Sequence, residues 1–140
     1  MQVLSDTVHI KVRFSEVDSM NIVWHGAYVK YLEDGRESFG KKYGITYQDV
    51  LESGYYIPIV KLNCVYQLPL RYGDSAIVET RFINSDAAKI LFDYSIYRES
   101  DQALILEASS MQVFLNQQQE LELNTPPFFA DWKKKHLAFL

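Results

Sequence analysis

Cysteine is almost absent from this sequence. Cys64 is the single example, so no disulfide bond and no cysteine-based zinc site can form within the chain. Because Cys64 stands in an apolar run that is typical of a strand, we expect a small buried hydrophobic residue rather than a reactive thiol. Histidine is nearly as rare. The three copies, His9, His25 and His136, are too scattered in the sequence to predict a metal site.

Three common catalytic motifs are missing as well. The sequence has no G-x-S-x-G nucleophile elbow, no glycine-rich phosphate loop and no H-E-x-x-H zinc motif. These absences argue against α/β-type serine hydrolases, P-loop nucleotide-binding proteins and zinc proteases. We expect no bound cofactor and no metal.

Positive charge is in the minority. Fourteen Lys and Arg residues stand against eighteen Asp and Glu residues, which gives a net charge of −4, and the one dense basic run is 133–135. Nucleic-acid binding needs a basic surface, so we expect no nucleic-acid partner. Residues 1–14 alternate polar with apolar and include an acid at Asp6, unlike a secretory leader or a membrane span. We therefore expect a cytoplasmic protein without a membrane span.

What the sequence does contain is typical of one globular domain. Of its 140 residues, 48% are hydrophobic and 23% are charged, which fits a soluble fold, and no linker or internal repeat divides it. We therefore predict a single domain over 1–140. Ten Tyr and eight Phe fit either a lined pocket or a tyrosine-rich sheet surface, and both interpretations stay open.

Three segments have the signals of helices: 24–40, 46–53 and a short C-terminal segment near 126–137. The first has apolar residues at helical spacing on one side and charged residues on the other. The second begins on Thr46, a good N-cap residue, and the third begins at Pro126, which suits a first helical turn. The longest helix therefore belongs near the N-terminus.

Five segments have the signals of strands: 7–14, 55–68, 75–84, 89–98 and 104–116. Pro58 within the second predicts an edge position or a bulge, because proline cannot donate to a strand partner. The short gaps between the last three predict an antiparallel meander. The fold class is therefore α+β, with an antiparallel sheet of five or more strands wrapped around one long central helix.

The stretch DSMNIVWHGAY, residues 18–28, combines an acid, a histidine and a tyrosine at a predicted helix start. A helix start offers unpaired N–H groups and the positive end of the helix dipole, which can polarise a carbonyl oxygen. Asp18, in the loop just before, could act on the same carbonyl. Structural alternatives stay open: Asp18 as a loop-stabilising cap, His25 as a packing residue and Tyr28 as part of the core.

The segment RFSEVDSMNIVWHGAYVKYLEDGRESF resembles the acyl-CoA thioesterases of the hydroxybenzoyl-CoA thioesterase type, which have the hotdog fold. The positions that carry the resemblance are Asp18, His25, Tyr28, Glu33 and Arg36, and the later segment LPLRYGD adds Arg71 and Asp74 at matching places. The resemblance extends over roughly residues 7–116. Two residues in the loop depart from the pattern: Val17 replaces a Thr and Asn21 replaces a Gly.

The resemblance implies hydrolysis of an acyl thioester to free acid and thiol, with Asp18 as general base or nucleophile and His25 in the same site. Backbone N–H groups near His25 and Gly26 would bind the carbonyl oxygen, and Tyr28 would contact the substrate. Glu33 is the reserve catalytic residue, because some related hotdog enzymes use a helix carboxylate. The thiol leaving group has a pKa of about 8.5, so one carboxylate with oxyanion stabilisation suffices.

Several charged residues have both a functional and a structural interpretation. Glu33 and Arg36 stand three apart, where a local ion pair on the helix is the alternative. Lys61, Arg71 and Lys89 are candidates for contacts with coenzyme A phosphates, and solvated strand cations are the alternative. The expected substrate is an acyl-CoA, with an acyl carrier protein as a second donor. The alternative function is a non-catalytic acyl-CoA-binding hotdog module, which would have no need of the acid in the loop.

The sequence also predicts a homo-oligomer, either a dimer or a tetramer. One helix covers only part of a sheet of five or more strands. The second faces of the strands carry further apolar residues, namely Leu91, Tyr97, Ile105, Met111, Val113 and Leu115. Pairing of two chains so that the sheet continues would cover strand edges. As the resemblance implies, it would also close an acyl pocket between subunits.

Overall fold

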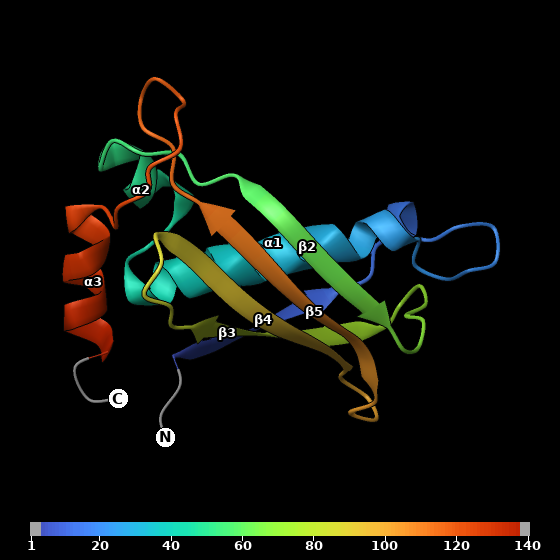
Figure 1. The fold of residues 1–140 in the computed structure, drawn as a ribbon. Helices are drawn as coiled ribbons and strands as arrows, with labels where there is room; N and C mark the ends of the chain where they lie inside the picture. Colours follow the sequence, from blue (N-terminus) through green and yellow to red (C-terminus); the bar gives the residue numbers. More distant parts are fainter. Residues whose placement is uncertain (1–3, 138–140) are drawn as a thin grey trace.

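A five-stranded antiparallel sheet curls around one long helix, α1 (Figure 1). The computed structural model describes residues 4–137. The strands are β1 (Ser5–Lys11), β2 (Ile59–Tyr66), β3 (Ser75–Ile83), β4 (Lys89–Arg98) and β5 (Leu104–Val113), in the sheet order β1-β3-β4-β5-β2. The helices are α1 (His25–Tyr43), α2 (Tyr47–Glu52) and α3 (Pro127–Leu137), and a short 3₁₀ turn spans Phe14–Glu16. The predicted α+β class, the central helix and the meander of β3, β4 and β5 are confirmed.

Four strands differ from their predicted bounds. β2 spans Ile59–Tyr66 rather than 55–68, and β3 ends at Ile83 rather than at residue 84. β1 ends at Lys11 rather than at residue 14, because a 3₁₀ turn follows it. β5 ends at Val113 rather than at residue 116. Beyond it, Leu115 forms isolated bridges with Tyr56 and Leu121, which a pattern of alternating residues does not distinguish from a continuing strand.

The end of α1 lies three residues beyond the predicted boundary. Gly44 caps it in the left-handed region, with φ of 74°, and the N–H of Ile45 donates to the Gly40 carbonyl at 2.9 Å. This is the usual glycine-dependent way to end a helix. The predicted cap of α2 is confirmed: Thr46 Oγ1 accepts from the N–H of Asp49 at 3.0 Å, and the Asp49 carboxylate accepts from the N–H of Thr46 at 2.9 Å.

β2 forms one edge of the sheet and pairs with β5 alone. Pro58 stands directly before it, and the pairing register shifts between Ile59 and Lys61, so both the edge position and the bulge predicted from the proline are confirmed. Cys64 lies in this strand and packs in part against the core. Burial raises the pKa of its thiol, which fits a packing role.

The core lies between α1 and the inner face of the sheet. The helix buries Tyr28, Tyr31, Leu32 and Phe39 on this side. Gly35 lets the helix approach closely, because a Cβ atom there would lie 2.5 Å from the Thr80 hydroxyl oxygen of β3. Tertiary packing therefore compensates for the helix propensity that glycine lacks.

α3 stands against the end of the sheet farthest from the start of α1 (Figure 1). Its Phe129 and Trp132 pack on Phe82 of β3, with ring centroids 6.4 and 5.1 Å away. The indole N–H of Trp132 donates to the Tyr43 carbonyl at 2.8 Å. This C-terminal helix therefore covers the end of the sheet within the chain.

The outer face of the sheet carries part of the predicted apolar set. Leu91 and Met111 are opposite each other in the register and alternate with inward-facing residues. The prediction for Ile105 was wrong. This residue lies at a register shift between β4 and β5 and is buried, because the bulge interrupts the alternation on which the prediction rested. In the part of the chain described here, no helix is long and apolar enough to span a membrane.

Candidate functional site

The loop that holds Asp18 projects beyond the start of α1 (Figure 1). One carboxylate oxygen, Oδ1, accepts from the N–H of Met20 at 2.8 Å and from that of Ile22 at 3.4 Å. Asn21 takes a left-handed conformation, with φ of 61°, and donates its N–H to the Asp18 carbonyl at 3.0 Å. The loop therefore fixes one carboxylate oxygen. The other, Oδ2, has no hydrogen-bond donor within residues 4–137.

Neighbouring backbone segments hold this loop in place. Asp18 donates its N–H to the Ile22 carbonyl at 2.9 Å, and Val23 donates to the Leu70 carbonyl at 2.9 Å. Ile22 also forms an isolated bridge with Arg71. The loop before α1 is thus attached to the segment before β3, the two parts of the sequence that carried the family resemblance.

The start of α1 presents unpaired backbone donors. Trp24 is the N-cap residue and offers no side-chain cap, and the N–H of Ala27 is already bonded to the Trp24 carbonyl at 3.0 Å. The N–H groups of His25 and Gly26 have no acceptor in the described part of the chain. A Cβ atom at Gly26 would lie 2.1 Å from the exposed Trp24 ring, so a larger residue here would displace that ring. Two N–H groups at a helix start suit an anionic or polarised oxygen.

His25 and Tyr28, the other two residues of the motif, have different environments. His25 is exposed, and its ring meets that of Tyr66 edge-on, with centroids 5.3 Å apart. Tyr28 is buried; its hydroxyl accepts from the N–H of Leu70 at 3.0 Å, and burial raises the pKa of that hydroxyl. This position favours the packing alternative for Tyr28. Within residues 4–137, no hydrogen bond joins Asp18 to His25.

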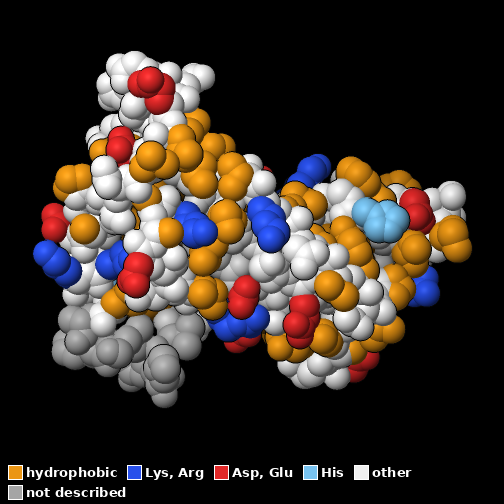
Figure 2. Space-filling view, viewed as in Figure 1, with side chains coloured by type: hydrophobic (Ala, Val, Ile, Leu, Met, Phe, Trp, Pro, Cys, Tyr) orange, Lys and Arg blue, Asp and Glu red, His pale blue; other side chains and the backbone are white. Residues whose placement is uncertain are grey.

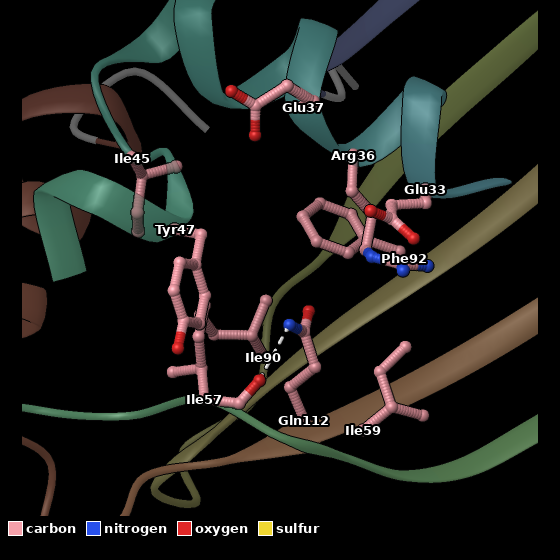
Figure 3. Close-up of a pocket in the computed structure, with 10 residues that line it drawn as sticks. All are labelled: Glu33, Arg36, Glu37, Ile45, Tyr47, Ile57, Ile59, Ile90, Phe92 and Gln112. Atoms are coloured by element: carbon pink, nitrogen blue, oxygen red, sulfur yellow. Dashed lines mark hydrogen bonds between the residues drawn. The ribbon is translucent and has the colours of Figure 1, made fainter. Parts of the chain in front are cut away.

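A separate cavity of about 220 Å³ lies between the middle of α1, α2 and the inner face of the sheet (Figure 3). Its walls are mainly apolar, and the residues that line it are Glu33, Arg36, Glu37, Ile45, Tyr47, Ile57, Ile59, Ile90, Phe92 and Gln112. Glu33, the reserve catalytic residue, is therefore in this cavity. Eight residues of helix, roughly 12 Å along the axis, separate Glu33 from His25.

A polar network that was not predicted from the sequence lies behind this cavity. Arg36 donates from Nη1 to the Tyr94 hydroxyl at 3.1 Å, and that hydroxyl is 2.5 Å from Ser110 Oγ. Gln112 donates from Nε2 to the Ile57 carbonyl at 3.0 Å. Burial raises the pKa of the Tyr94 hydroxyl. The available signal was the presence of polar residues at inward-facing strand positions, where buried polar groups need partners.

The three candidate phosphate-binding cations form two groups. Lys61 of β2 pairs with Met111 of β5, and Lys89 of β4 pairs with Val113 on the other side of β5. The sheet therefore brings these two lysines together. Arg71 lies instead beside the Asp18 loop, at the other end of β3. The structure therefore does not unite all three around one phosphate group.

An open groove of about 870 Å³ lies on the other side of α1, beside β1 and the 3₁₀ turn. Here the Tyr31 hydroxyl donates to Glu16 Oε1 at 2.8 Å. Burial, followed by the negative charges of Glu33 and Glu16, raises the pKa of Asp34. No group of three His, Cys, Asp or Glu residues within the described chain is placed to hold a metal ion.

Comparison with known proteins gives a consistent result. A family model described as the Thioesterase-like superfamily matches residues 12–133. YneP of Bacillus subtilis, described as a proposed acyl-CoA thioesterase, is 32% identical over 130 residues, which cover 93% of this chain and 91% of that protein. The chloroplast acyl-acyl carrier protein thioesterase ATL3 of Arabidopsis thaliana is 36% identical over 109 residues, covering 78% of this chain and 57% of that protein.

A solved structure supplies the fold comparison. It is an aspartate-to-asparagine mutant of 4-hydroxybenzoyl-CoA thioesterase complexed with 4-hydroxybenzoyl-CoA. The TM-score is 0.80 at 23% identity, over 94% of this chain and 97% of the other. The predicted hotdog fold is thereby confirmed.

Proposed function

The chain belongs to the thioesterase-like superfamily and is a thioester hydrolase; from this premise we propose that it hydrolyses acyl-CoA and that Asp18 performs the reaction. One observation carries the proposal. Within residues 4–137, Asp18 Oδ2 accepts no hydrogen bond, and the nearby N–H groups of His25 and Gly26 at the helix start donate none. A thioester needs both elements, a base or nucleophile and a site for the oxyanion.

As general base, Asp18 Oδ2 takes a proton from water while the water oxygen bonds to the carbonyl carbon. The negative charge then develops on the former carbonyl oxygen, where the N–H groups of His25 and Gly26 stabilise it. The C–S bond breaks as the C=O bond re-forms, and the thiolate of coenzyme A leaves. The proton held by Asp18 passes to solvent or to the thiolate.

As nucleophile, Asp18 would instead bond to the carbonyl carbon and expel the thiolate, forming a mixed anhydride that water then hydrolyses. Both routes use the same oxygen and the same N–H pair. The aspartate-to-asparagine mutant among the solved structures, captured with an acyl-CoA, supports testing the carboxylate of this chain in the same way.

The two edges of the sheet support a proposal for how a second copy binds. On β1 the exposed residues are polar, namely Thr7, His9 and Lys11, whereas β2 and the residues after it expose the apolar side chains Val60, Val65, Tyr66 and Leu68. An unpaired edge strand that exposes apolar side chains favours pairing with another strand. Hydrophobic side chains also gather around the end of the molecule where α1 begins (Figure 2). We therefore assign β2 as the homodimer edge.

Two-fold pairing of β2 with its copy would make a composite site. Ile59, at the start of the strand, lines the 220 Å³ cavity, and Tyr66, at its end, contacts His25. Antiparallel strands related by a two-fold axis bring the start of each beside the end of the other. The cavity of one chain would therefore face the Asp18 loop of the second copy, and the acyl group would occupy that cavity.

Acyl-CoA and an acylated carrier protein present the same thioester and pantetheine arm, and the matched relatives include thioesterases described for each donor. Lys61 with Lys89, or Arg71 beside the loop, would bind the phosphates of coenzyme A. We also propose a cytoplasmic location, as expected from the sequence.

A thiol-release assay of the purified chain tests the proposal, with acyl-CoAs of varied length and aromaticity and with acylated carrier protein as substrates. We expect release of one thiol and one free acid per thioester consumed. Tight acyl-CoA binding without thiol release would contradict hydrolysis and indicate the non-catalytic binding module instead.

A further inference from the structure

The guanidinium of Arg36 lines the 220 Å³ cavity with most of its N–H donors unused. An arginine has five N–H donors, and the described chain supplies one side-chain acceptor, the Tyr94 hydroxyl at 3.1 Å. Within residues 4–137 no carboxylate lies within ion-pair distance of Arg36, although Glu33 and Glu37 line the same cavity. Arg36 is half-buried, so its remaining donors are open either to water or to an acceptor on a bound acyl group.

The network behind Arg36 holds it in position. Tyr94 and Ser110 are both buried, at 0% and 4% exposed, and bond to each other across β4 and β5. The Tyr94 hydroxyl can therefore accept from Arg36 while it bonds to Ser110. Within residues 4–137 the other donors of Arg36 have no side-chain acceptor, and Arg36 lines the cavity beside Phe92 and Glu33 (Figure 3).

The geometry points to Arg36 as the residue that selects the acyl group, favouring acyl chains that carry a neutral oxygen acceptor, a hydroxyl or a keto group, at the far end from the thioester. This inference rests on the proposed function, in which the acyl group enters this cavity. Ligand pockets for whole drug-sized molecules measure about 300–1,000 Å³. A cavity of 220 Å³ therefore suits the acyl group and not the coenzyme A portion.

The charge of the cavity excludes an anionic acyl end. Glu33 and Glu37 contribute two negative charges against the single positive charge of Arg36, so a terminal carboxylate would meet net repulsion. A hydroxyl or keto oxygen accepts from the guanidinium without adding charge. The apolar walls, including Ile57, Ile90 and Phe92, would enclose the aliphatic or aromatic body of the chain.

The test compares saturated acyl-CoAs from butanoyl to dodecanoyl with their ω-hydroxy and ω-carboxy derivatives. In the wild type we expect kcat/KM for the hydroxy series to exceed that for the unsubstituted series by about ten- to hundredfold at the length that reaches Arg36, the usual range for a hydrogen bond to a charged group. We expect the carboxy series to be the poorest. Arg36→Met should abolish the hydroxy preference, and Arg36→Lys should retain part of it.

Lys41→Met is the matched control, because it removes one positive charge from an exposed position of the same helix. It should keep the preference. Tyr94→Phe is the second variant, in case Arg36→Met does not fold: it keeps the buried ring, removes the hydroxyl that holds Arg36, and should reduce the preference. A wild type without hydroxy preference at any length, or an unchanged preference in Arg36→Met or in a folded Tyr94→Phe, would overturn the inference.

An absence of hydrolysis can be distinguished from an absence of selection by Arg36. If no acyl-CoA releases thiol, the proposed function is wrong, and calorimetry with non-hydrolysable thioether analogues of the three series decides the role of Arg36 separately. Tighter binding of the hydroxy analogue in the wild type, lost in Arg36→Met, would support selection by Arg36. Equal binding of all three analogues would contradict it.

Discussion

The side chain of Tyr66 packs against His25. Their rings meet edge-on with centroids 5.3 Å apart, and the Tyr66 hydroxyl donates to the His25 carbonyl at 3.3 Å. Because Tyr66 ends β2 and His25 begins α1, this contact links the open edge of the sheet to the helix start that carries the unpaired N–H groups. Tyr28 extends the contact into the core, with its ring 5.4 Å from that of Tyr66.

Removing the Tyr66 ring should therefore disturb catalysis more than its exposed position suggests. We expect Tyr66→Ala to lower kcat by about tenfold, because the first turn of α1 loses the support that aligns its N–H groups. Tyr66→Phe keeps the ring and should stay close to the wild type. Tyr72→Ala, at another exposed tyrosine, is the control. Unchanged turnover in Tyr66→Ala would show that the helix start needs no such support.

Asp18→Asn tests the catalytic carboxylate. Asparagine can still accept from the N–H groups of Met20 and Ile22, so the loop should keep its shape, while the group that takes a proton or attacks the carbonyl is lost. We expect kcat to fall by roughly 10²–10⁴-fold, measured by thiol release. Asp86→Asn, at an exposed acid in the loop before β4, should leave kcat unchanged. Near-normal turnover in a folded Asp18→Asn protein would remove the assignment and promote Glu33.

The candidate phosphate contacts make a prediction about KM. If the sheet binds the phosphates, Lys61→Ala and Lys89→Ala should each raise KM for acyl-CoA more than they lower kcat, and added salt should reduce the difference from the wild type. If the loop end binds them, Arg71→Ala should do so instead. KM values unchanged in all three variants would mean that the pantetheine arm is held elsewhere, or that the natural donor is a carrier protein.

The sequence predicted the parts of this molecule that depend on local signals. The start of α1 and the Thr46 cap are set by neighbouring residues, so local spacing located them. Spacing alone left Asp18 open as a cap, and the family resemblance singled it out, because its loop is held by the distant Leu70 and Arg71. The Arg36–Tyr94 contact joins a helix to a strand 58 positions away, and no local pattern specifies it. The burial of Ile105 depends on a bulge in the pairing of two strands, which shifts the alternation of faces without any mark in the sequence.

The docking of α3 should weaken in acid. The His136 ring packs against Trp132 and Tyr43, with centroids 5.0 and 5.7 Å away, and burial, followed by the charge of Lys135, lowers the pKa of His136. The unfolded chain then binds the proton more readily than the folded one. Stability is therefore complete above the ordinary histidine pKa of about 6.5 and falls as the pH drops below it.

Urea unfolding monitored by tryptophan fluorescence measures this effect. Between about pH 8 and about pH 5, the wild type should lose more unfolding free energy than His136→Gln, which keeps a polar side chain that does not titrate. An identical pH dependence in the wild type and His136→Gln would show that this histidine does not couple protonation to folding.

The homodimer edge makes the last prediction. Lysine on an edge strand opposes pairing with another strand, because its charge must stay in water. Val65→Lys changes an exposed apolar position of β2, 49% exposed, and should shift the protein from dimer to monomer in light scattering at micromolar concentration. Thiol release should fall with it, since each cavity would lose the Asp18 loop of the second copy. Thr7→Lys makes the same kind of change on β1 and should leave both mass and activity intact. A tetramer built through the outer sheet faces or α3 would still contain the β2 pair and would also respond to Val65→Lys. A fully active wild-type monomer would show instead that each chain carries its own complete site.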